Sequence, residues 1–242
     1  MTRWLQGCWP GLLLAAAVLA VYLPVAGYDY VWDDLYVHLH ANPMVTDFGW
    51  EALGRLFAEP WLGLYVPLTY ATWGAAWQLV PAEQLPGVLH LLNLALHLAC
   101  SLLVLAILRR LIRSASPLPA LLGALVFALH PVQVETVAWI SELRALGAAA
   151  LGLLATWLAV RGAATARPWG LALLLAVLVV LANLFKPAAV VVPPGIFLLL
   201  WGFGLADWRR ALLLAGPALA VGLALAVLNA VVQTGVGAVP DT

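Results

Sequence analysis

The sequence predicts an all-α membrane protein, a polytopic bundle of about seven transmembrane helices in one domain covering residues 1–242. Composition is the first reason: 65% of the residues are hydrophobic and 9% are charged, whereas soluble domains carry about 25% charged residues. The mean hydropathy of +1.02 agrees with this. The apolar residues also form long continuous runs, which suits lipid rather than water as the solvent.

Seven apolar runs approach the ~20 residues that a helix needs to cross a bilayer. Proline is expected to end one helix and start the next at His130-Pro131 and at Lys186-Pro187. The first run is longer than the apolar core of a signal peptide, which favours a retained helix. We expect the helices at about 7–27, 87–108, 117–134, 145–161, 169–185, 187–204 and 211–233.

Arginine placement predicts the orientation of these helices. The side that holds the N-terminus receives Arg3, Arg109, Arg110, Arg113, Arg161, Arg167, Arg209 and Arg210. Only Arg55, Arg144 and Lys186 fall on the other side, together with most of the acidic residues. Since cytoplasmic loops are rich in Lys and Arg, we expect a cytoplasmic N-terminus and an acidic external face. The Ala- and Leu-rich, Lys-poor composition favours a bacterial inner membrane.

An external loop of roughly sixty residues, about 28–86, separates the first two helices. Its many Trp, Tyr and Leu residues argue against disorder, and loops of this length are usually functional. We expect Asp47 to cap a short amphipathic helix that runs to Phe57. The segment is expected to fold back onto the membrane surface through an interfacial aromatic belt formed by Trp61, Tyr65, Tyr70, Trp73 and Trp77.

Two adjacent carboxylates, Asp33 and Asp34, open this loop. They should repel each other and be partly desolvated by their aromatic neighbours, which raises the pKa of at least one of them. A carboxylate of this kind serves as a general base or a metal ligand. The alternative is a capping or solvated pair.

Charged residues near helix ends provide further candidates. Arg144 and Lys186 lie at the membrane boundary, where a lipid phosphate would be, and together they predict an anion site; the alternative for each is a snorkelling side chain. His130 and Glu135 are costly at this depth unless paired or functional. A divalent metal held by these two residues and a loop aspartate is left open as an alternative. Glu142 lies just beyond them.

Polar residues inside the helices have a simpler interpretation. His90, Asn93 and His97 share one face of the second helix. We expect them to point into the bundle and to make interhelical hydrogen bonds. The same expectation holds for Asn183 and Asn229.

Six short motifs occur in a characteristic order. They are Val31-Trp32-Asp33-Asp34, Tyr65-x-Pro67-Leu68, Leu89-His90-x-x-Asn93-x-x-x-His97, Phe127-Ala128-x-His130-Pro131-x-x-x-Glu135-x-Val137, Ser141-Glu142-x-Arg144, and Lys186-Pro187 through Pro193. In order and spacing they resemble the transmembrane O-mannosyltransferases that carry tetratricopeptide repeats, including their bacterial relatives. That family belongs to the multi-span glycosyltransferases of the GT-C class. The resemblance covers about residues 1–210.

The resemblance implies a function at the external face. Asp33 and Asp34 would be the catalytic acidic motif, and the donor would be a sugar, such as mannose, on a polyprenyl phosphate. The acceptor would be a hydroxyl group, such as that of a protein Ser or Thr, so that the reaction is an O-glycosylation. Arg144 and Lys186 are then expected to bind the donor phosphate, with Tyr65, His90 and Glu142 as further polar site residues. Membrane lipid is the other expected partner, and no nucleic-acid motif is present.

The chain departs from the family pattern in three respects. Val66 stands where the family usually has an arginine, and Ala145 stands where it often has an aspartate. No 34-residue helical repeat is present, so we expect the chain to be the N-terminal membrane part of a longer enzyme. The alternatives are a non-catalytic protein that binds or flips lipid-linked sugars and an inactive membrane scaffold.

Overall fold

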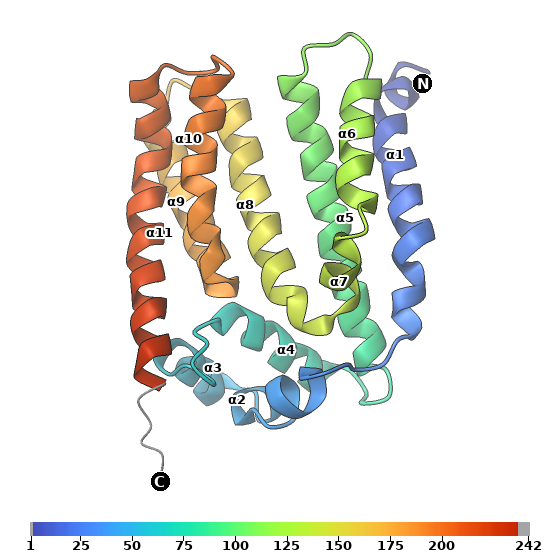
Figure 1. Ribbon diagram of the computed structural model, residues 1–242, viewed down its shortest axis with the longest axis vertical. Coiled ribbons are helices and arrows are strands. Elements are labelled where there is room, and N and C mark those ends of the chain that lie inside the picture. The colour runs from blue at the N-terminus through green and yellow to red at the C-terminus, as the bar shows by residue number, and fades with distance from the viewer. Residues whose placement is uncertain (1, 237–242) are drawn as a thin grey trace.

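The computed structural model describes residues 2–236, with the side chains of residues 8–233, and this part of the chain is helical without β-strands (Figure 1). Long helices stand side by side, and short helices lie across one end of the bundle. In chain order the elements are α1 (Thr2–Tyr22), η1 (Leu23–Gly27), η2 (Asp34–Leu39), α2 (Pro43–Thr46), α3 (Trp50–Ala58), α4 (Pro67–Leu79), α5 (Leu85–Leu111), α6 (Leu118–Leu129), α7 (Gln133–Ala138), η3 (Ile140–Glu142), α8 (Leu143–Gly162), α9 (Pro168–Phe185), η4 (Pro187–Val191), α10 (Val192–Gly202) and α11 (Trp208–Val236).

Within these residues, five helical segments are long and apolar enough to cross a membrane, so the chain is an integral membrane protein. They are Cys8–Gly27, Leu85–Leu111, Ile140–Gly162, Pro168–Phe185 and Trp208–Gln233. The other two expected positions hold shorter apolar helices, because α6 has 12 residues and α10 has 11. The prediction of a polytopic helical membrane protein is therefore confirmed.

Proline ends two of the helices, α6 and α9. Residue 130, before Pro131, is extended and ends α6 at Leu129, because the residue before a proline is disfavoured in the helical conformation. The predicted helix 117–134 is thus interrupted: residues 130–132 form a turn, and residues 133 and 134 begin α7. Lys186, before Pro187, is likewise extended and ends α9.

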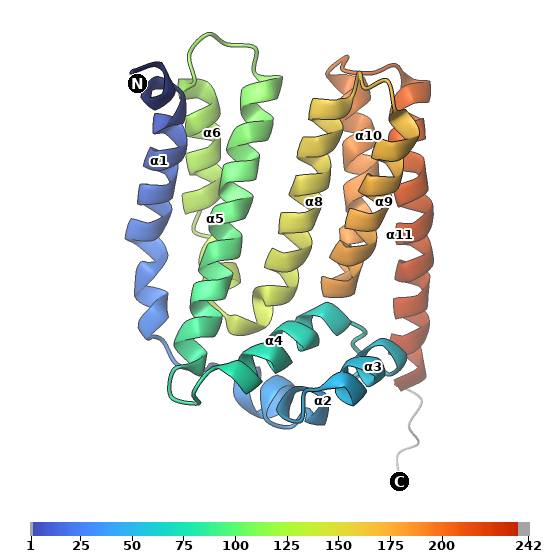
Figure 2. The ribbon, with the colours of Figure 1, turned by 180° about the vertical axis from the view of Figure 1, so that it is seen from behind.

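The segment 28–86, predicted to be external and called the external segment below, folds into η2, α2, α3 and α4 and closes one end of the bundle (Figures 1 and 2). Its core contains Leu39, Met44 and Leu56 and extends into the bundle through Leu143 at the start of α8. A hydrogen bond of 3.2 Å from the Thr69 hydroxyl of α4 to the backbone carbonyl of Phe185 fastens the segment to the end of α9.

Two details of this segment differ from prediction. Tyr70 and Trp73 are 2% and 1% exposed, so they belong to the core rather than to an aromatic belt. Asp47 does not cap α3, whose N-cap is Gly49; it lies at the C-terminal end of α2. The side chain that caps a helix here is Asn42, whose Oδ1 accepts a hydrogen bond from the Met44 amide at 3.0 Å.

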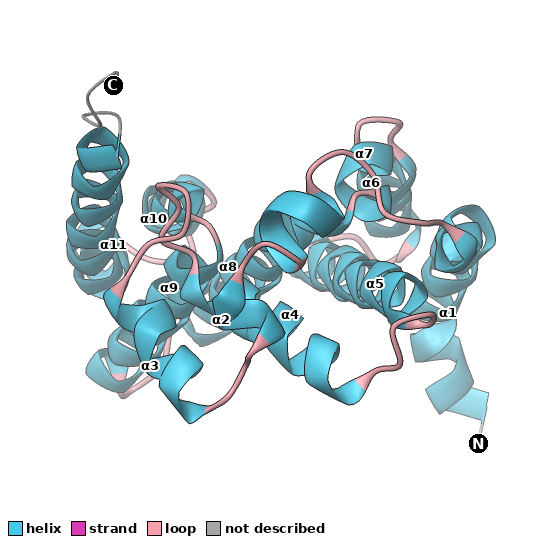
Figure 3. Ribbon diagram, turned by 90° about the horizontal axis from the view of Figure 1, so that it is seen from below, coloured by secondary structure: helices cyan, strands magenta, loops and turns pink. Residues whose placement is uncertain are grey.

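Charge is separated along the bundle axis, as the sequence predicts. The turns α5–α6, α8–α9 and α10–α11 lie at the same end as the N-terminus (Figure 1). They and the helix ends beside them carry Arg109, Arg110, Arg113, Arg161, Arg167, Arg209 and Arg210. The side chain of Arg3 lies outside the described side chains. The acidic external segment closes the opposite end, seen from below in Figure 3.

Candidate functional site

The two adjacent carboxylates occupy a strained turn at the closed end of the bundle. Trp32, directly before them, has a φ of 51°, a left-handed conformation that costs a residue with a side chain about 1–3 kcal/mol. Asp33 is the residue before the π-helical turn η2, and Asp34 is the first residue of that turn. The turn places Asp34 in the interior at 1% exposure, while the Asp33 side chain keeps 36% of its surface exposed.

Asp34 is held on all sides by hydrogen bonds. Its Oδ1 accepts from the Ser141 hydroxyl at 2.7 Å and from the Ser141 amide at 3.0 Å, and its Oδ2 accepts from the Val31 amide at 3.1 Å. Burial raises the pKa of Asp34, and the hydrogen bonds from Ser141 and Val31 oppose that rise. Asp34 therefore anchors the external turn to η3.

Asp33 has only one occupied carboxylate oxygen. Its Oδ2 lies 3.1 Å from Nε2 of His38, whereas its Oδ1 is buried and has no hydrogen-bond partner in the described part of the chain. Burial lowers the pKa of His38, the positive charge of Arg144 lowers it further, and Asp33 acts in the opposite direction. His38 is thus a neutral imidazole at physiological pH.

Tyr70 extends this contact into α4. Its hydroxyl lies 3.4 Å from Nδ1 of His38, and burial raises the pKa of Tyr70 while Arg144 lowers it. Neither His38 nor Tyr70 was predicted to be a site residue. A carboxylate and a histidine five residues apart, Asp33 and His38, are the only signal that the sequence offers for this contact.

The two predicted phosphate ligands lie at this end of the bundle and differ in their pairing. Arg144 donates from Nε to the Ser141 carbonyl at 2.9 Å, and among residues 8–233 its two terminal nitrogens make no hydrogen bond. Lys186 Nζ pairs with Glu142, 3.3 Å from Oε2 and 3.5 Å from Oε1. Glu142 is therefore the counter-ion of Lys186.

The remaining predicted site residues lie apart from this cluster. His130 is exposed, and its Nδ1 accepts from the Val132 amide at 3.2 Å. Glu135 is also exposed, and no bond joins the two. No three His, Cys, Asp or Glu side chains of the described residues lie close enough to hold a metal ion. Tyr65 donates to the Phe57 carbonyl at 3.1 Å and so holds the loop after α3.

The polar face of α5 binds backbone carbonyls of other segments, but of the three predicted interhelical bonds only that of His97 reaches another helix, α6. His90 Nε2 lies 3.4 Å from the carbonyl oxygen of Asp29 in the external turn. Further along the helix, Asn93 donates to the Trp139 carbonyl at 2.8 Å and His97 Nε2 lies 2.9 Å from the carbonyl oxygen of Ala128. These bonds position the turn that carries Asp33 and the segment that precedes Ser141.

Asn183 and Asn229 do not follow the same expectation. The Asn183 amide donates to the carbonyl of Val179 at 2.8 Å, and that of Asn229 to Leu225 at 3.0 Å. Both partners lie four residues earlier in the same helix, so the predicted interhelical bonds are wrong. Helical side chains can satisfy their donors locally in this way.

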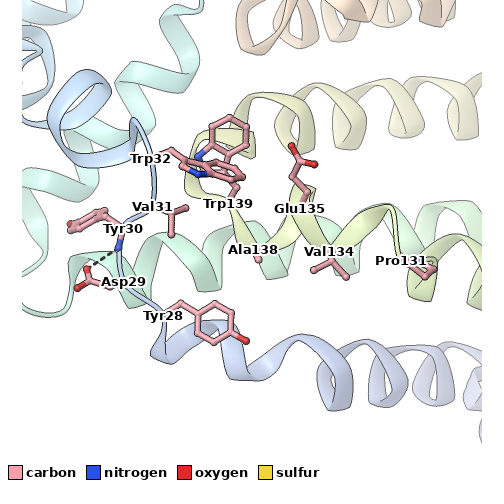
Figure 4. Close-up of a pocket in the computed structure, with 10 residues that line it drawn as sticks. All are labelled: Tyr28, Asp29, Tyr30, Val31, Trp32, Pro131, Val134, Glu135, Ala138 and Trp139. Carbon is pink, nitrogen blue, oxygen red and sulfur yellow. Dashed lines mark hydrogen bonds between the residues drawn. The ribbon is translucent and has the colours of Figure 1, made fainter.

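A groove of about 730 Å³ adjoins the Asp33 turn (Figure 4). Aromatic and aliphatic side chains form most of it, and the Trp32 and Trp139 rings meet edge to face at 4.9 Å between centroids. Asp29 and Glu135 add two exposed carboxylates. The groove therefore suits a ligand with both apolar and hydroxyl-bearing faces.

Comparisons with protein-family models, with curated proteins and with solved structures found no match for this chain. The resemblance described above therefore rests on the six sequence motifs alone. The structure brings residues of three of these motifs together, since Asp34 bonds Ser141 and Lys186 pairs with Glu142.

Proposed function

We propose that this chain carries the catalytic end of a membrane glycosyltransferase. The reaction would move a sugar, with mannose as the first to test, from a polyprenyl phosphate to a hydroxyl acceptor such as a protein Ser or Thr. The main support is the geometry of the Asp33 carboxylate. Its Oδ2 lies 3.1 Å from His38 Nε2, and its Oδ1 has no hydrogen-bond partner within residues 8–233. The order of the six motifs supports the same assignment.

The two carboxylates receive different roles in this proposal. Asp34 already accepts three hydrogen bonds and is almost fully buried, so we assign it to holding the turn. Asp33 would be the general base: when the acceptor binds and displaces the side chains that cover Oδ1, this oxygen would take the acceptor's hydroxyl proton as the acceptor oxygen attacks the anomeric carbon. The bond from that carbon to the phosphate oxygen breaks in the same step, and the phosphate leaves with the electron pair.

Arg144 and Lys186 would bind the phosphate and stabilise the charge that it gains on leaving. The terminal nitrogens of Arg144 can form a bidentate pair with phosphate oxygens. Lys186 would exchange Glu142 for the phosphate, because its side chain is 37% exposed and its pair at 3.3 Å is accessible to a ligand. A single displacement of this kind inverts the configuration at the anomeric carbon.

The membrane placement forms part of the same proposal. We propose a cytoplasmic N-terminus, with the arginine-bearing turns inside and the Asp33 end outside, in a bacterial inner membrane. In this arrangement α6 and α10 also cross the membrane, which gives seven spans. The groove beside Trp32 would then open at the outer boundary, where a lipid-linked sugar presents its head group.

Donor binding and sugar transfer, measured on the purified chain in detergent with a polyprenyl-phosphate mannose and a hydroxyl acceptor, test the proposal. Asp33→Asn is expected to bind the donor normally and to transfer at least about 100-fold more slowly. Arg144→Ala/Lys186→Ala is expected to lose donor binding. Arg55→Ala is the matched control, since Arg55 is a cation of the external segment whose one ion pair within residues 8–233 is with Glu59, on the exposed surface at the end of α3.

Three results would contradict the proposal. Absence of donor binding by the wild type would favour an inactive scaffold. A wild type that binds the donor but transfers no sugar, together with an Asp33→Asn variant whose donor binding or transport is undiminished, would favour a carrier. A product that retains the donor configuration would exclude the single displacement.

A further inference from the structure

We propose that His38 is a positioning residue, held by Tyr70, that orients the Asp33 carboxylate for proton abstraction. This inference rests on the proposed function and assigns a role to His38 and Tyr70, which lie outside the six motifs. The three side chains form one hydrogen-bonded chain across the external segment, from Asp33 through His38 to Tyr70 of α4.

Geometry places the imidazole between its two partners. Nε2 lies 3.1 Å from Asp33 Oδ2, and Nδ1 lies 3.4 Å from the Tyr70 hydroxyl. His38 and Tyr70 are 4% and 2% exposed, so water competes little for these bonds. The π-helical turn η2 makes the first contact possible, because it brings residue 38 back toward residue 33, and the His38 amide also bonds the Asp33 carbonyl at 3.2 Å.

The chemistry of the three groups fixes the tautomer. An ionised carboxylate only accepts hydrogen bonds, so the proton of the neutral imidazole sits on Nε2 and points to Asp33. Nδ1 then has a lone pair and accepts the Tyr70 O–H. The charged or titratable groups that act on His38 are Asp33 and Asp34 from its own segment, Tyr70 from α4 and Arg144 from α8.

The consequence for Asp33 is directional. With Oδ2 bonded to the imidazole, the carboxylate cannot rotate freely, and the buried Oδ1 is the oxygen left to receive the acceptor's proton once the bound acceptor has displaced the side chains that cover it. A misplacement of about 1 Å can slow a reaction by about 100-fold. Loss of His38 should therefore reduce kcat and leave the affinity for the donor, which depends on Arg144 and Lys186, unchanged.

Three variants separate positioning from mere packing. His38→Leu introduces an apolar side chain of similar size and removes both hydrogen bonds. We expect kcat to fall by about 10- to 100-fold at unchanged donor Kd. His38→Gln restores an N–H donor near Asp33 and is expected to recover most of that loss. Tyr70→Phe removes only the outer bond, so a smaller loss of about 3- to 10-fold is expected. Gel filtration and thermal unfolding show whether each variant is folded.

A spectroscopic measurement tests the geometry without any substrate. In the ¹⁵N spectrum of histidine-labelled wild-type protein, the signal that disappears in His38→Gln belongs to His38, one of five histidines. We expect the neutral tautomer with the proton on Nε2, and protonation only below the ordinary pKa of about 6.5. Tyr70→Phe should allow the other tautomer to appear.

The possible failures are distinguishable. A wild type that transfers sugar, with a His38 signal of the Nδ1–H tautomer or with full kcat in His38→Leu, overturns the positioning role alone. A His38→Gln variant no better than His38→Leu also overturns it. A wild type that transfers no sugar overturns the proposed function, and the positioning role with it, whatever tautomer the spectrum shows.

Discussion

Replacing Ser141 by alanine is expected to destabilise the folded protein by about 1.5–3 kcal/mol, the contribution of a hydrogen bond to a charged group. The Ser141 hydroxyl lies 2.7 Å from Asp34 Oδ1, and the two residues are 0% and 1% exposed. The Ser141 and Val31 amides keep their bonds to Asp34 in this variant. The change therefore removes one bond to the carboxylate and leaves the turn in place.

The effect should depend on pH, with a sign that follows from the Asp34 carboxyl. Burial raises its pKa in the folded state above the unfolded value of 3.8. Its contribution to stability is therefore greatest at low pH and declines as the pH rises through the raised pKa. Loss of the Ser141 bond raises that pKa further, so the gap between variant and wild type should be widest at neutral pH and should narrow in acid.

Thermal unfolding in detergent measures both effects. For a chain of this length, 1 kcal/mol corresponds to about 2–4 °C in Tm, so Ser141→Ala should unfold about 3–12 °C below the wild type at pH 7. Ser101→Ala is the matched control, because Ser101 is also fully buried but donates to the His97 carbonyl of its own helix. A Tm within 1 °C of the wild type, or a gap that is equal at pH 7 and pH 4, would refute the reasoning.

Two further predictions concern helix packing and the anion site. A Cβ added to Gly147 would lie 2.5 Å from the Phe185 ring, so Gly147→Ala should lower the free energy of unfolding by about 1–3 kcal/mol. Gly195→Ala, which meets nothing within 4 Å, should leave the Tm unchanged or raise it. Glu142→Gln should cost less than about 1 kcal/mol of stability and, by releasing Lys186, should tighten polyprenyl-phosphate binding measured by titration. Weaker binding in this variant would contradict the assignment of Lys186.

The sequence predicts the membrane helices well because lipid imposes a simple requirement. Every span needs a long apolar run, and such runs are visible without any tertiary information. The error at residues 130–134 arose from the same rule, since the run continues past Pro131 although the helix ends at Leu129. Charge asymmetry likewise identified the arginine-bearing end, because each turn carries its own signal.

The site was only partly predictable. Asp33, Asp34, Arg144 and Lys186 were singled out as candidates because charges at a predicted membrane boundary are costly and therefore conspicuous. The link to His38 depends on a π-helical turn, whose spacing of five residues matches neither an α-helix nor a strand.

Aromatic and histidine residues in the external segment were harder to place. Tyr70 looked like an interfacial aromatic, because a sequence does not distinguish a ring at a membrane surface from one buried in a small core. His130 and Glu135 looked like a pair through their spacing, but the turn at Pro131 leaves both exposed without a bond between them.

The fastening of the external segment to the bundle has a consequence for biogenesis. Asp34 bonds a residue 107 positions later, and Thr69 bonds the carbonyl of a residue 116 positions later. At about 5–20 residues per second, a ribosome reaches each of these partners roughly 5–25 s after it has made the residue that bonds it. During that interval the segment has left the membrane-insertion machinery with a carboxylate and an aromatic core that lack their partners. Ribosome stalling before α8, or a truncation there, would thus present quality-control proteases with an open, unfastened segment.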